Sequence, residues 1–598
     1  MAIINARSPY YVSITNNTIS YATLDISIWS GSSASVATEN TSYSLRKSIH
    51  TTDTKVSFEI SQLVRDDLDV NFDGNYTTSA TSDGGAKWVK TTIKAFNSSD
   101  AQVGSTVTET NIAFDGYGYF EEGSSFTMAN ESLFTSEGDI FLPKFGDSNI
   151  AIYTGNNPTV LLKDIAGATV DTSSFTSSVQ SSEQIKYVSL YPELVTNVGF
   201  DDAADWTIRT NDVIEDGLLK CGGQSGDRVN NAFTPVTGTN YILKFTITDY
   251  TSGWIGAYTG VGGVNISGQL SKTGTYTYQY TQGTTTLNQV SFYTSSGFNG
   301  SIDNVSLKEV YDVSKISVTD SLSSELVTNG NFQTDTDWQK TPTATIGSGK
   351  ASFIGSVGEL SDIQQPSVFT IGNTYLVTID AVVTSGLGIK VQEGGLGESI
   401  GVITSTGSYS FTFTSNFSST LYIGRRNGGQ PFNCSVDNVS VIQIKPDINT
   451  ANVKQVEECK FKPHKVTFVN KNGVLDDMYF FKKSTDSMTT KRESYNANTI
   501  KADNTYSINQ HNKREFNITA NSMVKLSSGY LNESSNEKFK QLLLSEKVWI
   551  TRTFKNDELV LPINIKTSSI SYKTSLNDKL VDYTIEFNDS YNAINNIR

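Results

Sequence analysis

The segment ELVTNVGFDDAADW, residues 193–206, returns as ELVTNGNFQTDTDW at residues 325–338. Glu, Leu, Val, Thr, Asn, Phe, Asp and Trp keep their register over the shift of 132 positions. The copies also end alike, with SIDNVSLKEV from Ser301 and SVDNVSVIQI from Ser435. Solenoid and propeller repeats recur every ~20–50 residues. A repeat as long as this one therefore predicts two tandem domains, at 193–311 and 325–444.

The composition of the whole chain favours strands over helices. Its 598 residues correspond to several domains, roughly four at ~150 residues each. Only 18% of the residues are charged, whereas Tyr and Phe number 28 and 30. Aromatic residues with many Ser, Thr, Gly and Asn are typical of short strands joined by turns. We therefore expect an all-β protein built from several β-sandwiches.

Charge and cysteine content exclude several classes of protein. The net charge is −15 and the pI is near 4.8, whereas binding to nucleic-acid phosphates needs a surface rich in Lys and Arg. A glycan or another protein is a more suitable partner. Three cysteines cannot form a disulfide framework. With no basic start followed by an apolar run, and no ~18 consecutive apolar residues, we expect neither a secretion signal nor membrane insertion.

The segments outside the repeats are also strand-like. From Tyr10 to Trp29 apolar and polar residues alternate around Asn16-Asn17, which predicts a β-hairpin. We assign 1–125 to an N-terminal β-sandwich and 126–192 to a β extension of the same body. The separator YDVSKISVTDSLSS is polar and predicts a connector between two beads.

The C-terminal segment, 450–598, is richer in lysine and predicts further strands and one short helix near 535–545. Ser534-Ser535-Asn536-Glu537 has the pattern of a capping box, and an apolar face of Phe539, Leu542 and Leu543 follows. The segments before and after the repeats resemble strand edges of a single body. We therefore expect 450–598 to pack with 1–192 and to carry the repeats as an insertion, the alternative being four or five independent beads.

The repeats resemble the carbohydrate-binding modules of the CenC-like superfamily, through ELVTNGNF…DW at the start and VDNVSV at the end. This resemblance covers about 240 residues and implies β-sandwich jelly rolls of the kind found in glycan-active enzymes and phage structural proteins. It also implies a structural calcium, with Asp303 and Asp437 as matching ligands. Asp201 fits the opening ligand position in the first copy, whereas Gln333 replaces it in the second.

The outer segments resemble virion structural proteins of tailed phages. The resemblance rests on FEISQLVRDD, IAFDGYGYFEEG, VTFVNKNGVLDDMYFFKK and the ending VDYTIEFNDSYNAINNIR. The layout is similar to that of distal tail proteins, whose ring-forming β body can carry inserted carbohydrate-binding domains. It implies a symmetric homo-oligomer in contact with other virion proteins.

Candidate glycan-binding residues are aromatic side chains that could stack on sugar rings, together with polar groups for the hydroxyls. In the first repeat these are Trp254, Tyr258 and Tyr278, although the alternation of Tyr276, Tyr278 and Tyr280 equally fits a sandwich core. The second repeat has Gly386 at the position 132 residues after Trp254. It could bind through Arg425 and Asn427, or serve only as a spacer. Trp206 and Trp338, which both copies share, are expected in the cores.

Evidence for catalysis is weak. The chain has three histidines without metal-ligand spacing, no GxSxG elbow and no phosphate-binding glycine loop. The carboxylate pairs Glu121-Glu122 and Asp476-Asp477 are adjacent in sequence, whereas glycosidase carboxylates face each other across a cleft ~5–9.5 Å wide. Asp69 to Gly74 match half of a calcium loop, but the twelfth position is Ala80, so a polar turn is the simpler interpretation.

These observations predict a structural, non-enzymatic virion protein of a tailed phage, in the tail or tail tip. Its two modules would contact host-surface glycans, and no cofactor is required beyond the possible structural calcium. Two alternatives remain: a capsid-decoration or fibre protein with the same modules, and a secreted polysaccharide hydrolase with accessory binding modules.

Overall fold

The computed structural model confirms the all-β class and the short helix near 535–545, which is α3 (Asn536–Leu544). The structure describes residues 3–30, 41–49, 52–76, 85–123, 133–143, 146–153, 158–164, 169–170, 177–179, 185–189, 193–202, 205–208, 212–222, 228–232, 238–258, 265–283, 289–295, 297–310, 313–320, 324–395, 399–426, 430–445, 449–458, 460–554, 557–569, 571 and 580–594.

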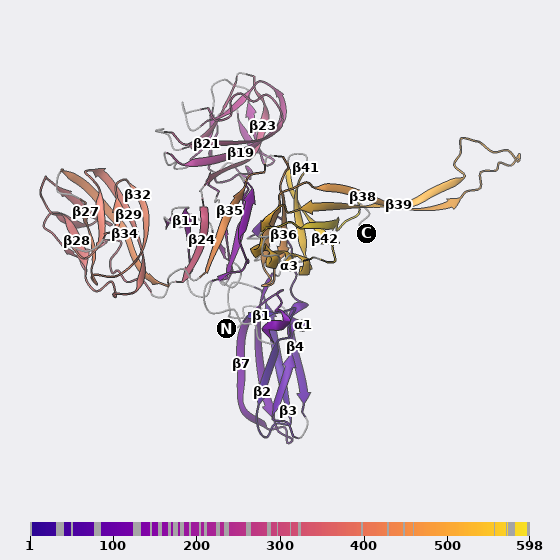
Figure 1. Ribbon diagram of the computed structural model, residues 1–598, viewed down its shortest axis with the longest axis horizontal. Helices are drawn as coiled ribbons and strands as arrows, with labels where there is room; N and C mark the ends of the chain where they lie inside the picture. The colour runs from indigo at the N-terminus through magenta and orange to yellow at the C-terminus, as the bar shows by residue number, and fades with distance from the viewer. Residues whose placement is uncertain are drawn as a thin grey trace.

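The N-terminal segment forms a sandwich, at the bottom of Figure 1. A five-stranded sheet of order β1-β7-β6-β3-β4 faces the strand pair β2-β5, and the short helix α1 follows β5. The bounds are β1 (Ile3–Asn5), β2 (Tyr11–Thr15), β3 (Tyr21–Trp29), β4 (Thr41–Ser48), β5 (Lys55–Glu59), α1 (Ser61–Arg65), β6 (Ala86–Phe96) and β7 (Gln102–Phe114).

The predicted hairpin around Asn16-Asn17 is wrong. β2 ends at Thr15 and pairs with β5, whereas β3 begins at Tyr21 and pairs with β4 and β6. The turn at Asn16 therefore carries the chain from one layer of the sandwich to the other. Alternation identifies each strand and its buried face, but it does not identify the partner strand.

Two small sheets continue the body. One has the order β13-β14-β10-β8 and the other the order β12-β11-β24-β35-β9. Their bounds are β8 (Leu133–Phe134), β9 (Ile140–Pro143), β10 (Asn149–Tyr153), β11 (Pro158–Asp164), β12 (Thr169–Val170), β13 (Ser177–Val179), β14 (Ile185–Ser189), β24 (Val313–Asp320) and β35 (Asn449–Val456).

Strand β24 lies in the separator between the repeats, where the sequence predicted a polar connector. It pairs with β11 on one side and with β35 on the other. Ile316 and Val318 are buried, at 1% and 0% exposure. The connector prediction is wrong because these alternate apolar residues fill the body core. The repeats are thus two separate insertions, and the chain returns to the body between them.

Each repeat is a two-sheet sandwich, at the top and at the left of Figure 1. The sheet orders are β15-β18-β22-β20 and β16-β17-β23-β19-β21 in the first module, and β25-β28-β33-β30-β31 and β26-β27-β34-β29-β32 in the second. The bounds are β15 (Trp206–Thr207), β16 (Val213–Glu215), β17 (Leu218–Gly222), β18 (Arg228–Ala232), β19 (Asn240–Ser252), β20 (Ile255–Tyr258), β21 (Gly274–Thr281), β22 (Gln289–Thr294), β23 (Asn299–Val310), β25 (Gln339–Lys340), β26 (Ala344–Gly347), β27 (Lys350–Gly355), β28 (Asp362–Gln365), β29 (Thr374–Ser385), β30 (Ile389–Glu393), β31 (Ser399–Ile403), β32 (Gly407–Thr414), β33 (Leu421–Arg425) and β34 (Phe432–Ile444).

The duplicated motif joins the start of each sandwich to its last strand. The Glu193 carboxylate accepts a hydrogen bond from the Leu307 amide at 2.6 Å, and Glu325 accepts one from Val441 at 2.7 Å. The shared phenylalanines of the motif, Phe200 and Phe332, are fully buried. The motif Glu and Phe recur in both repeats because each copy joins the start of its own module to the last strand and to the core.

The shared tryptophans lie in the cores, as the sequence predicted. Trp206 Nε1 donates to the Asn197 carbonyl at 3.0 Å, and Trp338 Nε1 donates to the Asn329 carbonyl at 3.2 Å. Both asparagines have positive φ, 53° and 51°. Asparagine tolerates this conformation better than most residues, which explains why both copies keep it at this turn.

Glu193→Ala should lower the free energy of unfolding of the first module by about 1–3 kcal/mol, because the Leu307 amide loses its acceptor. Chemical denaturation followed by the fluorescence of the buried Trp206 measures this change. As a control, Glu215→Ala removes an exposed carboxylate paired with Lys220 and should cost less than about 1 kcal/mol. Equal losses in the two variants would contradict this role of Glu193.

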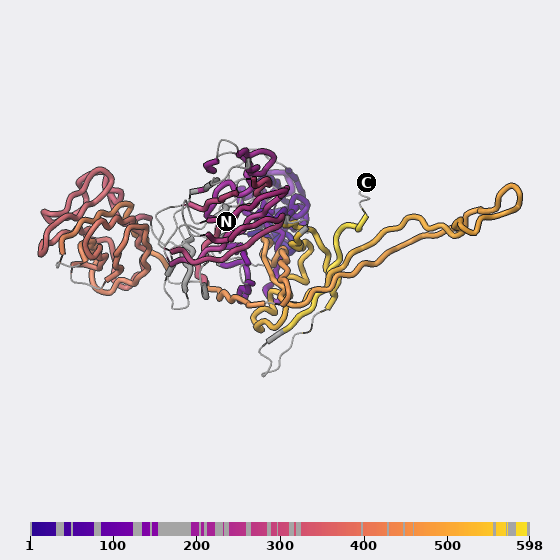
Figure 2. Tube along the Cα trace, turned by 90° about the horizontal axis from the view of Figure 1, so that it is seen from above, coloured from indigo at the N-terminus to yellow at the C-terminus, as the bar shows by residue number. Residues whose placement is uncertain are grey.

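The C-terminal segment forms a seven-stranded sheet of order β37-β36-β41-β42-β44-β39-β38, beside the pair β40-β43. The strands β38 and β39 leave this sheet as a long arm (Figures 1 and 2). The bounds are β36 (His464–Val469), β37 (Leu475–Phe480), β38 (Thr485–Asn496), β39 (Lys513–Ser527), β40 (Leu531–Asn532), β41 (Val548–Phe554), β42 (Asp557–Ile565), β43 (Leu580–Val581) and β44 (Thr584–Asp589).

The helix α3 begins later than the capping box predicted. Its N-cap is Ser535, whose side chain makes no capping hydrogen bond. Glu537 does not reach back to the helix start. Instead, its carboxylate accepts hydrogen bonds from the Tyr119 hydroxyl at 2.5 Å and from the Gln541 amide at 3.3 Å. The capping-box prediction is wrong because Glu537 binds the N-terminal segment.

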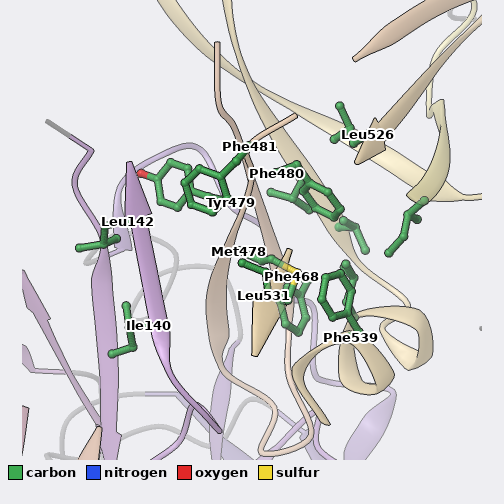
Figure 3. Packing of buried hydrophobic residues seen from close by; sticks show 14 of the residues in the cluster. Ile140, Leu142, Phe468, Met478, Tyr479, Phe480, Phe481, Leu526, Leu531 and Phe539 are labelled. Carbon is green, nitrogen blue, oxygen red and sulfur yellow. The ribbon is translucent and has the colours of Figure 1, made fainter. Parts of the chain in front are cut away.

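The two ends of the chain share a core. In one cluster Trp29, Trp88 and Phe114 of the N-terminal sandwich pack with Leu475 and Trp549 of the C-terminal sheet. In a second cluster, Ile140 and Leu142 of β9 pack with residues of the C-terminal segment, which are labelled in Figure 3: Phe468, Met478, Tyr479, Phe480, Phe481, Leu526, Leu531 and Phe539. The body is thus built from segments on both sides of the insertions.

A buried ion-pair network reinforces this contact. The Asp477 carboxylate, 1% exposed, lies 3.1 Å from Lys465 Nζ, whose side chain is 15% exposed. Asp477 also accepts hydrogen bonds from Thr467 Oγ1 at 2.7 Å and from the hydroxyl of Tyr76 in the N-terminal segment. Ser148 Oγ donates to it at 3.3 Å. One carboxylate therefore joins three segments that are distant in sequence.

Candidate functional site

The first module carries an aromatic cluster on the outer face of its four-stranded sheet. The rings of Trp254 and Tyr293 stack with their centroids 5.6 Å apart and an interplanar angle of 18°. The Tyr258 ring lies 5.8 Å from Tyr293. Ile255 and Ala257, which alternate with these residues on β20, are fully buried in the core. Strand alternation therefore turns Trp254 and Tyr258 outward, and all three rings are partly exposed.

The backbone holds this cluster in place. The Trp254 amide donates to Ser295 Oγ at 2.8 Å, and the Ser295 amide donates to the Trp254 carbonyl at 2.9 Å. The Tyr258 hydroxyl accepts a hydrogen bond from Asn265 Nδ2 at 3.0 Å. Gly256 lies between the rings, where an added Cβ would meet the Gly268 carbonyl oxygen at 2.7 Å. These contacts fix a rigid, partly exposed aromatic surface, which suits the apolar face of a sugar ring.

Tyr293 was missed by the sequence analysis. It lies on β22, directly opposite Gly256 on β20, and about forty residues separate it from Trp254. The local sequence SFYTS is unremarkable for a strand. Only the pairing of β20 with β22 brings the two rings together.

Tyr278 lies on a different surface of the module. Its ring is 6.3 Å from Phe245, and Tyr276 and Tyr280 pack against the same core from β21. The alternation of tyrosines therefore fills the edge of the core, which was the second of the two interpretations. The structure brings Trp254 and Tyr258 together and leaves Tyr278 out of this cluster.

In the second module the predicted residue Arg425 is engaged internally. Its guanidinium lies 4.4 Å from the Phe432 ring centroid and donates to the carbonyls of Ser356, at 3.2 Å, and Glu359. These bonds hold the turn after β27. Asn427 lies outside the described residues. The Arg425 side chain therefore stabilises the module itself. To bind a ligand through its guanidinium, it would have to give up these hydrogen bonds.

Gly386 is not the counterpart of Trp254. A Cβ on Gly386 would meet Phe432 at 2.9 Å, just as one on Gly253 would meet Phe298 at 2.4 Å. Both glycines have positive φ, 100° and 78°. Gly386 is therefore the counterpart of Gly253. The 132-residue shift between the two repeats does not hold at this position because the loops of the two modules differ in length.

The outer face of the same sheet in the second module is lined by a tyrosine and amides. Tyr422 alternates with the buried Leu421 and Ile423 on β33 and pairs directly with Gln364 and Gln392 on the neighbouring strands. Directly opposed residues lie on one face of a sheet. Burial, helped by a hydrogen bond to Asp362, raises the pKa of the Tyr422 hydroxyl above its ordinary value. This face differs chemically from the aromatic cluster of the first module.

The predicted calcium ligands make local hydrogen bonds. Asp303 accepts from the Asn304 amide at 2.6 Å, Asp437 accepts from the Asn438 amide at 2.7 Å, and the amide of the exposed Asp201 donates to Asn197. Within the ranges that the structure describes, no three His, Cys, Asp or Glu side chains gather as a metal site. Calcium binding there stays a prediction.

The calcium-like turn at 69–74 also makes structural contacts. Asp69 accepts hydrogen bonds from Lys547 Nζ and from Asn71 Nδ2, the latter at 3.2 Å. The Asn75 amide donates to Asp73 at 2.8 Å. These contacts agree with a polar turn. Ala80, the twelfth position of the loop pattern, lies outside the described residues.

Three of the four carboxylates considered for hydrolysis are paired with lysines. Asp476 lies 2.9 Å from the Lys538 ammonium, and both side chains are buried. Glu122 pairs with Lys471, and Asp477 pairs with Lys465. Asp476 and Asp477 face opposite sides of β37, as adjacent strand residues do. They do not form a pair of carboxylates facing each other across a cleft.

Comparisons with known proteins do not assign this chain to a family. No protein-family model matches it, and no curated protein matches it. The tandem CBM22 domains of Paenibacillus barcinonensis Xyn10C align at 9% identity and a TM-score of 0.15, over 42% of this chain and 96% of theirs. Such low scores do not establish a common fold.

Two other solved structures align over more of the chain, with equally low scores. A triple jelly-roll turret protein of an archaeal virus aligns at 8% identity and a TM-score of 0.13, over 76% of this chain and 85% of its own. Bacteroides ovatus SGBP-B, solved with a mixed-linkage heptasaccharide, aligns at 12% identity and a TM-score of 0.13, over 74% of this chain and 94% of its own.

In the described part of the chain, no helix has the length and apolar character needed to cross a bilayer.

Proposed function

We propose that this chain is a structural, non-enzymatic protein of a tailed-phage virion, located in the tail or tail tip, whose modules bind host-surface glycans. The observation that carries the binding part is the partly exposed aromatic cluster of the first module, in which Trp254 stacks on Tyr293 and Tyr258 lies beside Tyr293. The body would contact other virion proteins and further copies of the chain. No cofactor is needed beyond the possible calcium, and the acidic composition disfavours nucleic acid as a partner.

The way the modules are inserted supports this function. Each module leaves the body and returns to it through a strand, β24 or β35, so both of its ends are anchored. Such a module can project toward a surface without separating from the scaffold. Several copies on one particle would bind in concert, because the effective concentration multiplies a weak single-site affinity.

Trp254→Ala should reduce glycan binding by the full-length chain at least about tenfold, because a stacked aromatic ring is lost from the binding surface. Tyr293→Ala should have a similar effect. A glycan array, followed by titration of the best glycan, measures both. Phe417→Ala, which removes an exposed ring from the second module, is the matched control and should leave binding unchanged.

Three further outcomes would change the assignment. Unchanged binding in Trp254→Ala would move the site away from this cluster, and the Tyr422 face would be tested next. Release of reducing sugars by the purified chain would favour the polysaccharide hydrolase. Antibody labelling of the particle head would favour the capsid-decoration alternative over a tail protein.

A further inference from the structure

Among the described residues, the arm formed by β38 and β39 is paired with no other strand over most of its length. All twelve residues of β38 are exposed, as are Lys513 to Ile518 on β39. β39 pairs with β44 only from Met523 to Ser527, at the base of the arm. Among the described strands, β38 pairs with β39 alone. At about 3.3 Å per residue, β38 extends roughly 40 Å, and Figure 2 shows the arm projecting from the body.

The arm carries apolar side chains that are exposed to solvent. Tyr495 and Phe516 pack edge to face with centroids 5.6 Å apart, and both remain exposed. Further exposed apolar side chains lie along the arm and at its tip: Met488, Ile500, Tyr506, Ile508 and Ile518. A two-stranded hairpin is at best marginally stable alone in water, and its open edges invite pairing. Exposed apolar side chains on both strands, beside open strand edges, favour contact with another protein.

The charge of the arm indicates which protein it binds. Between Thr485 and Ser527 the chain has six Lys and Arg against four Asp and Glu, within a protein of net charge −15. The N-terminal sandwich and the two modules, by contrast, are all acidic. Asp and Glu outnumber Lys and Arg by fourteen to eight in 1–125, eleven to six in 193–311 and nine to five in 325–444. Complementary charge of this kind favours association.

We propose that the arm of one copy docks on the acidic surface of a second copy of this chain and thereby holds the copies together. The apolar residues of the arm would be covered in this contact, and its basic residues would face the partner's carboxylates. This inference rests on the proposed assembly role but not on glycan binding. A chain that binds no glycan could still assemble through the arm.

Sedimentation velocity of the full-length chain tests the proposal, over a range of concentrations at low and high salt. In the arm-shortened variant, an Asn-Gly turn replaces residues 491–519 and joins Thr490 to Ala520, which are paired across the arm. We expect the full chain to self-associate and the shortened chain to remain monomeric. Unchanged thermal unfolding of the body would show that the shortened chain is folded.

A charge variant gives a second test that keeps the whole arm. Lys513→Glu with Arg514→Glu should weaken self-association about tenfold at low salt and less at high salt, because salt screens exposed charges. Phe417→Ser, on the second module, is the control and should not change it. A full chain that stays monomeric throughout, or a shortened chain that associates as well as the full one, would overturn the proposal. The second result would leave the assembly role itself standing.

Discussion

Replacing Asp477 with alanine should lower the free energy of unfolding of the body by about 3–5 kcal/mol. The Lys465 ammonium, 15% exposed, would lose the carboxylate that lies 3.1 Å from it, and removing one partner of a buried ion pair leaves an uncompensated charge. The hydroxyls of Tyr76 and Thr467 would lose their acceptor at the same time. Denaturation followed by tryptophan fluorescence measures this loss, since Trp88 and Trp549 lie in the shared core.

Two comparisons make this test specific. Glu586→Gln breaks more exposed pairs with Lys525 and Lys566 and should cost much less than Asp477→Ala, because exposed ion pairs contribute little to stability. Tyr76→Phe should destabilise the native chain but add little in the Asp477→Ala background, because its acceptor is already gone. If the two losses simply added, Tyr76 and Asp477 would not be coupled, and the contact between the ends of the chain would not depend on this network.

Phe332→Ala should destabilise the second module by about 3–5 kcal/mol and leave the first module unchanged. Phe332 is fully buried and its ring lies 5.3 Å from Trp338, so truncation removes core contacts and leaves a cavity. Phe200→Ala should produce the same loss in the first module, where Trp206 lies 4.8 Å away. Differential scanning calorimetry should show one transition lowered in each variant.

Ile371→Ala is the control for the two phenylalanine variants. It truncates a side chain of the second module that is 61% exposed, so stability should change by less than about 0.5 kcal/mol. A shift of both module transitions by either phenylalanine variant would contradict the expectation. It would mean that the modules unfold as one unit despite the body strand β24 between them.

Local sequence patterns predicted where the strands lie better than they predicted which strands pair with each other. The alternation from Tyr10 to Trp29 marks two strands correctly, yet those strands belong to different layers. The segment 313–320 is polar overall, but its buried apolar residues Ile316 and Val318 decide its place in the body sheet. Pairing depends on strands far away in the sequence, so a local pattern contains no information about it.

Part of the candidate site was likewise predicted from the sequence, and part of it was identified only in the structure. Trp254 and Tyr258 were identified from a glycine-rich aromatic segment, and the structure places them together. Tyr293, which completes the cluster, and Tyr422, which lies on the corresponding sheet of the second module, were not identified. Each lies on a strand of ordinary composition, and its exposure depends on which face of the sheet is turned outward.

By itself, the sequence determined the all-β class, the duplication and the residues that close each module. These features depend on composition, on alternation over a few residues and on a motif whose Glu, Phe and Trp serve the same contacts twice. Only the tertiary structure decided that the modules are two insertions, that Asp477 joins the ends of the body and that, among the described strands, the outer part of the arm is paired with no other strand. The first two features depend on contacts between residues more than a hundred positions apart, which form only when distant strands pair and bury their side chains together.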